Sequence, residues 1–396
     1  MIKHLIYILW TRKRKNSLMV VEIAFSFLIL FLLFTLLINK YKNASHPIGF
    51  NTENILILNL DQDNVDKEDK TKEKQDELYN AIFQTIKQEN DVIGVSEIDY
   101  SHPYSGSRNT TRLVVGEGVR FDPTEQRFRP SAFDLMDLDF IKGRGFTFED
   151  AQLGYSPIVV NNQFYQKLLP FLDENEMFES EGTSYKITGV VSYYNKQSDF
   201  SEQEDIVIRS ADYLDWLKDT HQDRLFVKTK NDPRKLEASI VSSIEKLNPK
   251  LVVSTDYFDS LQDSYNKWEI LPIFLISFVA MFLVLNIALG LYGVLWYNIS
   301  RRKSEIGVRR AMGASSSEIF QQMLLEVVLL FIIGVVIGGI FAMQFPLLGV
   351  FNYTTMEYTM GALIAFGFVF IIILICGYYP SKLATKVTPN EALHEL

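Results

Sequence analysis

The chain has 396 residues, of which 47% are hydrophobic and 22% charged, and its formal net charge is −9. An acidic balance argues against a dedicated nucleic-acid-binding protein, which presents a basic face. The single cysteine, Cys376, excludes an intramolecular disulfide framework and a multi-cysteine metal site. The mean hydropathy of +0.05 is high for a chain with this many charges, so we expect apolar and charged residues to be segregated.

Four long apolar stretches predict membrane-spanning helices. Such a helix needs ~20 mostly apolar residues to cross ~30 Å of hydrocarbon. We place the spans at 17–39, 270–297, 323–345 and 360–380. A secretory signal is the alternative for the first stretch. That stretch is longer than the ~7–15-residue apolar core of a signal, and no small-residue cleavage site follows it, so we expect a retained anchor.

Basic residues orient the predicted spans, because positively charged segments stay in the cytoplasm. The basic segments are 1–16, 298–322 and 381–396. The connection 346–359 carries only Glu357. We therefore expect both termini and the 298–322 loop to be cytoplasmic and residues 40–269 to lie outside. Residues 1–16 also show an apolar helical face, which fits an amphipathic helix at the inner membrane surface.

Residues 40–269 predict a large α+β domain between the first two spans. The domain holds 41 acidic and 27 basic residues. We favour a solvated acidic surface, and binding of a cationic substrate is the alternative. The expected fold class is thus an α-helical membrane protein with four transmembrane helices and an inserted α+β extracytoplasmic domain of two subdomains.

Both ends of this domain predict a strand, a helix and a strand. The strand-like runs are 55–60, 92–98, 225–229 and 251–254. The first helix has an apolar face at i, i+3, i+4 spacing, made of Leu78, Ala81, Ile82, Thr85 and Ile86. Pro233 opens the second helix. The two similar pieces suggest one discontinuous subdomain, and 110–210, with short strands and glycine-marked turns, reads as an inserted strand-rich subdomain.

The sequence contains no catalytic signature. It has neither the glycine and lysine spacing of an ATP-binding P-loop nor the H-E-x-x-H or G-x-S-x-G patterns. The outer histidines His46, His102 and His221 share no ligand spacing. We therefore expect no enzyme activity, no cofactor and no metal in this chain.

Three polar residues fall in or near predicted spans. Glu22 and Glu326 are near the expected cytoplasmic ends, where a structural interfacial role, a coupling role and a proton relay are the alternatives. Asn286 can hydrogen-bond a neighbouring helix, a contact worth ~1 kcal/mol in lipid.

Small residues mark one face of the third span. Gly334 and Gly338 are four residues apart, with Gly339 beside them. Such a face permits close helix packing. We favour packing inside the bundle over a dimer seam.

The segment after the second span, Arg301 to Ala314, reads RRKSEIGVRRAMGA. It strongly resembles the R-x-x-E-I-G-x-x-R/K-A-x-G-A signature of FtsX-like and MacB-like ABC transporter permeases. Glu326 and the glycines after it resemble the third span of that family. Further resemblances lie at Pro380–Ala384 and Pro389–Leu393 in the tail, and at Ala132–Phe146 and Tyr185–Val191 in the outer domain.

The resemblance implies that the loop after the second span forms a short coupling helix that docks on an ATPase. Here that helix maps to about 313–322, where a serine can cap its start and Gly307 and Gly313 allow tight turns. The candidate coupling residues are Glu305, Gly307, Arg309, Arg310, Ala311, Gly313, Ala314, Ser315 and Glu318. The alternative is that the arginines only fix topology.

Similar permeases often carry a fused ATPase domain before the first span, where this sequence has 16 residues. We therefore expect a separate ABC ATPase subunit that binds ATP and Mg²⁺. We also expect a second permease, as a homodimer or a sister subunit, in a bacterial inner membrane. A periplasmic adaptor and an outer-membrane duct are further candidate partners.

By resemblance, such a permease works by mechanotransmission. Movements of its outer domain export a peptide, toxin, antibiotic or lipoprotein. An FtsX-like regulator of an extracytoplasmic cell-wall hydrolase is the alternative. A membrane sensor is a third class, but it would need a cytoplasmic output domain.

Overall fold

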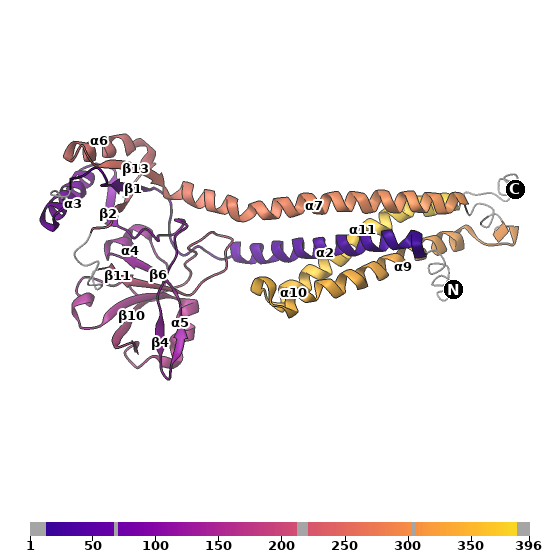
Figure 1. Cartoon of the computed structure of the whole chain (residues 1–396), viewed down its shortest axis with the longest axis horizontal. Coiled ribbons are helices and arrows are strands. Elements are labelled where there is room, and N and C mark those ends of the chain that lie inside the picture. The colour runs from indigo at the N-terminus through magenta and orange to yellow at the C-terminus, as the bar shows by residue number, and fades with distance from the viewer. Residues whose placement is uncertain are drawn as a thin grey trace. The chain divides into compact units, whose positions relative to one another are not determined.

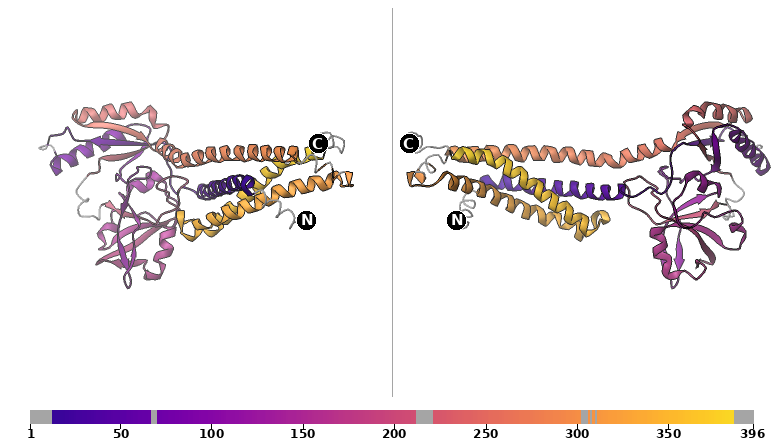
Figure 2. Two further views of the ribbon diagram at one scale, coloured as in Figure 1. Left: turned by 45° about the vertical axis from the view of Figure 1, so that its right-hand side comes forward. Right: turned by 180° about the vertical axis from the view of Figure 1, so that it is seen from behind.

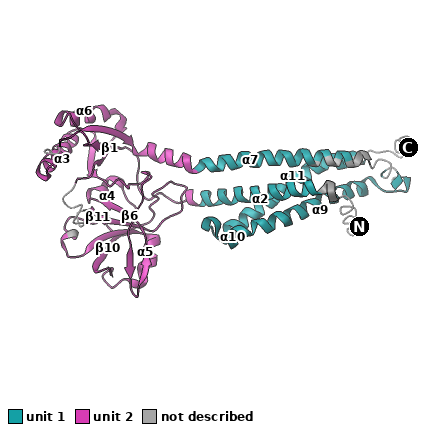
Figure 3. Cartoon of the chain, viewed as in Figure 1, with its two compact units in different colours: residues 1–42, 270–396 teal, residues 43–269 magenta. Residues whose placement is uncertain are grey.

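The structure is a computed structural model that describes residues 13–66, 70–211, 221–301, 306, 308–309 and 311–385. The chain divides into two compact units (Figure 3). The first comprises residues 1–42 and 270–396, and the second residues 43–269. The expected fold class is confirmed, since four helices are long and apolar enough to cross a membrane and a mixed α/β unit lies between the first two. Most of the predicted N-terminal amphipathic helix lies outside the described residues.

Long helices make up the described part of the first unit (Figure 1). They are α2 Lys13–Ala44, α7 Phe258–Arg301, α9 Ser316–Ala342, the short α10 Gln344–Leu347 and α11 Thr355–Ala384. The helices extend beyond the predicted spans at most ends. In lipid this is expected, because a helix satisfies its own backbone hydrogen bonds.

Glycines bring α9 and α11 close to α2. A Cβ at Gly334 would lie 2.6 Å from Ile23, and one at Gly338 would lie 2.6 Å from the carbonyl oxygen of Ala24. On α11, a Cβ at Gly361 would lie 3.0 Å from the Thr35 backbone. Gly339, in contrast, faces open space. The small-residue face of α9 is therefore used for packing inside the bundle at two of its three positions.

A buried carboxylate ties the start of α11 to α2. Glu357 is 4% exposed and accepts hydrogen bonds from the Thr354 backbone nitrogen at 2.7 Å and the Thr354 hydroxyl at 2.9 Å. It also pairs with Lys42 Nζ at 3.1 Å. Because breaking a buried pair leaves an uncompensated charge, this contact fixes α11 against the end of α2.

The second unit contains a four-stranded sheet with strand order β13-β1-β12-β2. Its strands are β1 Ile55–Asp61, β2 Val92–Glu97, β12 Arg224–Thr229 and β13 Val252–Tyr257. The helices α3 Lys72–Lys87 and α6 Glu237–Leu247 contact each other and lie over one face (Figure 2). Every neighbouring pair of strands is antiparallel. Two β-α-β units therefore interleave in one sheet, as predicted from the two ends of the domain.

The residues between β2 and β12 form a larger, seven-stranded sheet. Its strands are β3 Asn109–Thr110, β6 Thr124–Phe128, β7 Phe140–Gly143, β8 Ser156–Asn161, β9 Met177–Ser180, β10 Thr183–Val191 and β11 Ile206–Ser210. A separate hairpin, β4 Leu113–Val115 with β5 Val119–Phe121, and the helices α4 Ser131–Met136 and α5 Asn162–Leu168 complete this part. It corresponds to the strand-rich insertion expected at 110–210.

Alternation along β1 separates two cores. Leu56, Leu58 and Leu60 pack with α3 and α6, whereas Ile55 and Ile57 belong to an aromatic-rich core on the other face. Side chains of a strand alternate between faces, so β1 serves both cores at once.

An ion-paired histidine links β2 to α3. His221 Nδ1 lies 2.6 Å from Glu97 and its Nε2 lies 2.9 Å from Asp76, while the ring stacks on Tyr79. Burial disfavours protonation of the ring, but the hydrogen bonds and charges of Glu97 and Asp76 outweigh it and raise the pKa of His221. The protonated form is therefore stabilised by folding.

We predict that Gly338→Ala destabilises the helical unit by about 1–3 kcal/mol, because the added Cβ meets a backbone oxygen that cannot move aside. Gly339→Ala is the matched control. It adds the same atom to open space and should be neutral or stabilising by up to ~1 kcal/mol, since alanine favours helix. Thermal unfolding of the purified full chain in nanodiscs measures both. Equal effects of the two substitutions would contradict the packing described above.

We predict that the stability contributed by His221 is present below pH ~6.5, the ordinary histidine pKa, and is lost as pH rises through the raised pKa of the folded state. Thermal unfolding between pH 6 and 9 should show His221→Gln destabilised at low pH, with the difference from wild type shrinking as pH rises. A pH-independent effect of His221→Gln would contradict the prediction.

Candidate functional site

The segment that carries the signature packs on the start of α9. Ile306 is 2% exposed and forms a small apolar cluster with Ile319 and Met323. Arg309 donates a hydrogen bond to Gln322 at 2.6 Å. Three of the predicted coupling residues, Glu305, Gly307 and Arg310, lie outside the described residues.

Gly313 and Ser315 shape the turn that enters α9. Gly313 has a φ of 96°, in the left-handed region that favours glycine. The Ser315 hydroxyl accepts from the Glu318 backbone nitrogen at 3.2 Å, and the Glu318 carboxylate accepts from the Ser315 backbone nitrogen at 2.8 Å. This reciprocal capping box satisfies two donors at the helix start. Ala311 and Ala314 flank the turn, exposed and half-buried respectively.

The short helix expected at about 313–322 begins at the Ser315 cap, but it does not end at 322. After the cap at Ser315, α9 runs without a break from Ser316 to Ala342. Ile319 and Met323 continue one apolar face across the predicted boundary, and no proline or glycine interrupts the helix there. The predicted coupling residues after Ser315 therefore form the first turns of the third long helix.

An exposed methionine stands out in the same turn. Met312 is 75% exposed and Val308 is 49% exposed, so two apolar side chains face outward beside the capping box. The signature pattern leaves the position of Met312 unspecified, and the sequence therefore gave no signal for it.

The three predicted intramembrane polar residues have different surroundings. Glu22 on α2 is half-buried and lies opposite Gly290 of α7, where a Cβ would come within 3.0 Å of its carboxylate. Glu326 is 7% exposed and so lies inside the bundle. Asn286 is exposed and donates to the Phe282 carbonyl in its own helix at 2.8 Å. In this chain Asn286 therefore bonds within its own helix, and a bond to a neighbouring helix stays a prediction.

The first turns of α7 belong to the second unit and are anchored there. Phe258, the first residue of the helix, is fully buried and stacks on Phe50 at 6.0 Å and against Phe226 at 4.9 Å. The first residue of the helix is therefore packed against two aromatic rings. Aromatic pairs of this kind contribute ~0.5–1.5 kcal/mol beyond their buried area.

One carboxylate, Asp199, holds the next two turns of α7. It accepts hydrogen bonds from Gln262 at 2.9 Å and from Asn266 at 2.8 Å, and the Tyr104 hydroxyl donates to it at 2.9 Å. The Asp199 backbone nitrogen donates in turn to Asn266 at 3.0 Å. Sequence reasoning missed Asp199, because among 41 outer acidic residues only the i, i+4 spacing of its amide partners distinguishes it.

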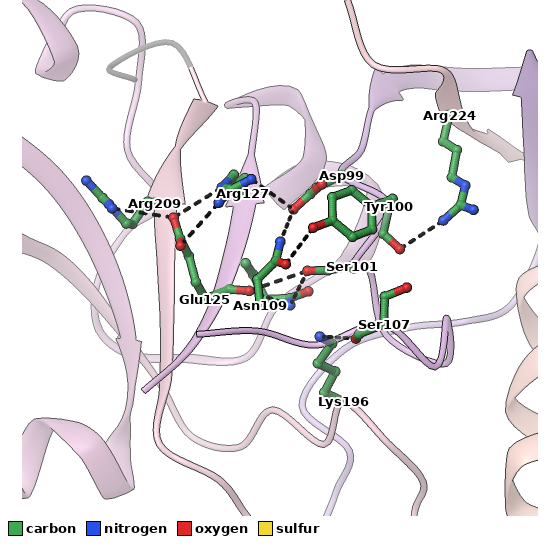
Figure 4. A network of polar contacts seen from close by, with 11 residues as sticks. Asp99, Tyr100, Ser101, Ser107, Asn109, Glu125, Arg127, Lys196, Arg209 and Arg224 are labelled. Carbon is green, nitrogen blue, oxygen red and sulfur yellow. Dashed lines mark hydrogen bonds and ion pairs between the residues drawn. The ribbon is translucent and has the colours of Figure 1, made fainter. Parts of the chain in front are cut away.

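A polar network braces the large sheet beside this anchor (Figure 4). Glu125 on β6 accepts from Arg127 at 3.1 Å and from Arg209 of β11 at 3.4 Å. Asn109 donates to Asp99 at 3.2 Å, and Arg127 lies 3.9 Å from Asp99. Burial raises the pKa of Asp99 despite the nearby arginine. Each carboxylate drawn here has a basic or amide partner, so we interpret the network as one that stabilises the sheet.

Two family models match the chain in succession. Residues 17–242 match the MacB-like periplasmic core domain, and residues 274–389 match the FtsX-like permease C-terminal model. The first match alone covers more than half of the chain, and the two together confirm the resemblance expected from the sequence.

Curated relatives carry related names. The probable syringafactin export ATP-binding/permease protein of Pseudomonas syringae is 25% identical over 320 residues, covering 76% of this chain and 48% of that protein. The macrolide export ATP-binding/permease protein MacB of Photorhabdus laumondii is 26% identical over 275 residues, covering 66% and 42%. The chain thus spans about half the length of these relatives.

Among solved structures, the periplasmic region of MacB from Actinobacillus actinomycetemcomitans matches with a TM-score of 0.37 and 13% identity, covering 54% of this chain and 92% of that chain. On the family models, this chain belongs to the FtsX-like ABC transporter permeases and carries a MacB-like periplasmic core domain between its first two membrane helices.

Proposed function

We propose that the chain is a permease subunit that couples ATP hydrolysis in a separate ABC ATPase to movement of its outer domain. The observation that carries the proposal is the continuity of α7. Its first turns are held in the second unit by Phe258 and Asp199, the second candidate membrane span runs from Phe258 to Gly290, and the signature segment follows its end. α7 remains one helix across its internal Pro272, so a displacement at one end would move the other.

The ATPase would bind at the turn before α9. There Met312 and Val308 expose apolar surface beside Arg309 and the capped helix start. The capping box holds the turn in one conformation, which lets a push on the turn act on α9 rather than deform the loop. ATP and Mg²⁺ would be bound by the partner, and both chain termini would lie on its side of a bacterial inner membrane.

Cargo would be moved outside the membrane by the outer domains of two permeases, in a homodimer or with a sister subunit. The two export proteins named above favour export over regulation of a cell-wall hydrolase. A peptide, toxin, antibiotic or lipoprotein is the proposed cargo class. An adaptor and an outer-membrane duct would extend the route.

We predict that Met312→Glu lowers co-purification of the ATPase at least tenfold, equivalent to ~1.4 kcal/mol, because a charge replaces the apolar contact. Met356→Glu is the matched control. Met356 is 70% exposed in the first turn of α11, where an added carboxylate suits the helix dipole. The readout is the amount of P-loop ATPase retained with the tagged chain from its native host. Equal retention by the two variants would contradict the proposed docking turn.

We predict that Asp199→Ala leaves ATPase co-purification unchanged but lowers cargo export several-fold, since the two amides on α7 lose their shared acceptor. Asp122→Ala, which removes an exposed carboxylate paired only with Arg120 near a hairpin, serves as the control. Export by cells carrying each variant measures the effect. Unchanged export with Asp199→Ala would argue against transmission through α7.

A further inference from the structure

The strand β13 forms a regular edge of the small sheet. It lies at the end of the strand order, and all six of its residues pair with Leu56–Asp61 of β1 without a register shift. The strand contains neither proline nor lysine. Its one charged residue, Asp256, accepts a hydrogen bond from Asn59 of β1 at 3.0 Å, so its carboxylate is turned toward β1.

Alternate backbone groups of β13 point out of the sheet. The backbone nitrogen of Leu60 on β1 donates to the carbonyl of Asp223, directly before β12. Backbone groups alternate between the two neighbours along an antiparallel strand, so Asn59 directs its groups to β13, where its partner is Ser254. The residues on either side of Ser254 therefore direct their N–H and C=O groups outward, and no backbone hydrogen bond from another described segment reaches them. These outward residues are Val253 and Thr255, followed by Tyr257.

Other sheet edges in the same unit are protected against pairing. β7 has four residues, includes Lys142 and pairs with β10 through a register shift, and β3 has only two residues. β2, at the opposite edge of the small sheet, pairs with β12 through a register shift, and Leu135 of α4 lies over its Gly94. Short strands, lysines, bulges and covering elements are the usual means of preventing edge pairing. β13 is neither short nor bulged and carries no lysine, so it remains able to pair.

An extended peptide fits this edge better than a second copy of the chain does. Donors and acceptors alternate along a free edge, and an extended backbone matches them residue by residue. A second copy would bring the same acidic domain, since residues 40–269 hold 41 acidic and 27 basic residues. Two such domains repel each other, whereas a basic peptide is attracted.

We propose that β13 binds an extended, basic peptide as a fifth strand of the small sheet, and that this peptide is cargo. Its identification as cargo rests on the proposed function, which includes peptides in the cargo class. The side chains of Val252, Ser254 and Asp256 are exposed on the sheet face that the added strand would share. A basic side chain opposite Asp256 and an apolar one beside Val252 suit that face, because cross-strand pairs of these kinds stabilise sheets.

Titration of the full chain, in phosphatidylcholine nanodiscs, with a fluorescein-labelled peptide of alternating lysine and valine tests the proposal by fluorescence anisotropy. We expect saturable binding that empty nanodiscs do not show. The fully N-methylated peptide, which has no backbone donor, should bind at least tenfold more weakly. A peptide with glutamate in place of lysine should also bind at least tenfold more weakly, because its charge is repelled.

Thr255→Pro should weaken binding of the peptide at least tenfold, since it removes an outward N–H group and leaves the ladder to β1 in place. Glu237→Ala is the matched control. It removes the side-chain hydrogen bond of Thr255 from its other end and leaves the backbone of β13 unchanged. Thermal unfolding checks that Thr255→Pro retains the fold, and the N-methylated peptide tests the wild-type chain if it does not.

The proposal is overturned if the N-methylated peptide binds as well as its parent, or if Thr255→Pro and Glu237→Ala have equal effects. Conversion of a dimer into a monomer by Thr255→Pro, measured by light scattering, would assign the edge to a second copy instead.

Export tests whether the peptide is cargo. Mass spectrometry of the basic peptides released by native host cells should show a several-fold loss with Thr255→Pro, while the ATPase retained with the chain is unchanged. Lost binding with unchanged export would overturn the assignment as cargo. Failure of the proposed function would show separately, as unchanged ATPase retention by Met312→Glu, because peptide binding is measured without the ATPase.

Discussion

The hydrogen bonds of Asp199 to the first turns of α7 are the contact on which the proposed function depends. A long helix transmits displacement only if its end is held firmly by the domain that it contacts. Phe258 packs among aromatic rings, and this apolar contact does not fix the rotation of the helix. Gln262 and Asn266 do fix that rotation, because their hydrogen bonds to Asp199 need a defined geometry. Both kinds of contact are needed, and the same polar cluster joins α7 to Tyr104 of the aromatic core.

The helical unit obeys a different constraint. Lipid offers no hydrophobic driving force between helices, so close approach and dispersion must hold the bundle together. Gly334, Gly338 and Gly361 place α9 and α11 against α2 at backbone distance. At one end, the polar contacts of Glu357 with Lys42 and Asn39 then fix the register of α11. Small residues set the spacing and one ion pair sets the alignment.

The sequence predicted the features that produce a local periodic pattern of apolar residues. Alternation and 3.6-residue spacing located the strands and helices of the small sheet, and Ile82 and Ile86 lie in its core as expected. The spacing missed Tyr79, whose buried ring carries a hydroxyl bonded to Asp223. Likewise Gly361 and Asp199 gain their roles from contacts far away in the chain, which no local pattern encodes. The end of the short helix expected at 313–322 was placed by a family analogy rather than by a helix-breaking residue, and α9 continues beyond it.

The acidic character of the outer domain has two origins that composition alone could not separate. Carboxylates such as Glu97 and Glu125 are buried with arginine partners, and their charge is neutralised inside the fold. Carboxylates such as Asp61 and Asp256 are exposed instead, and side chains of this kind make up the solvated acidic surface that the composition suggested.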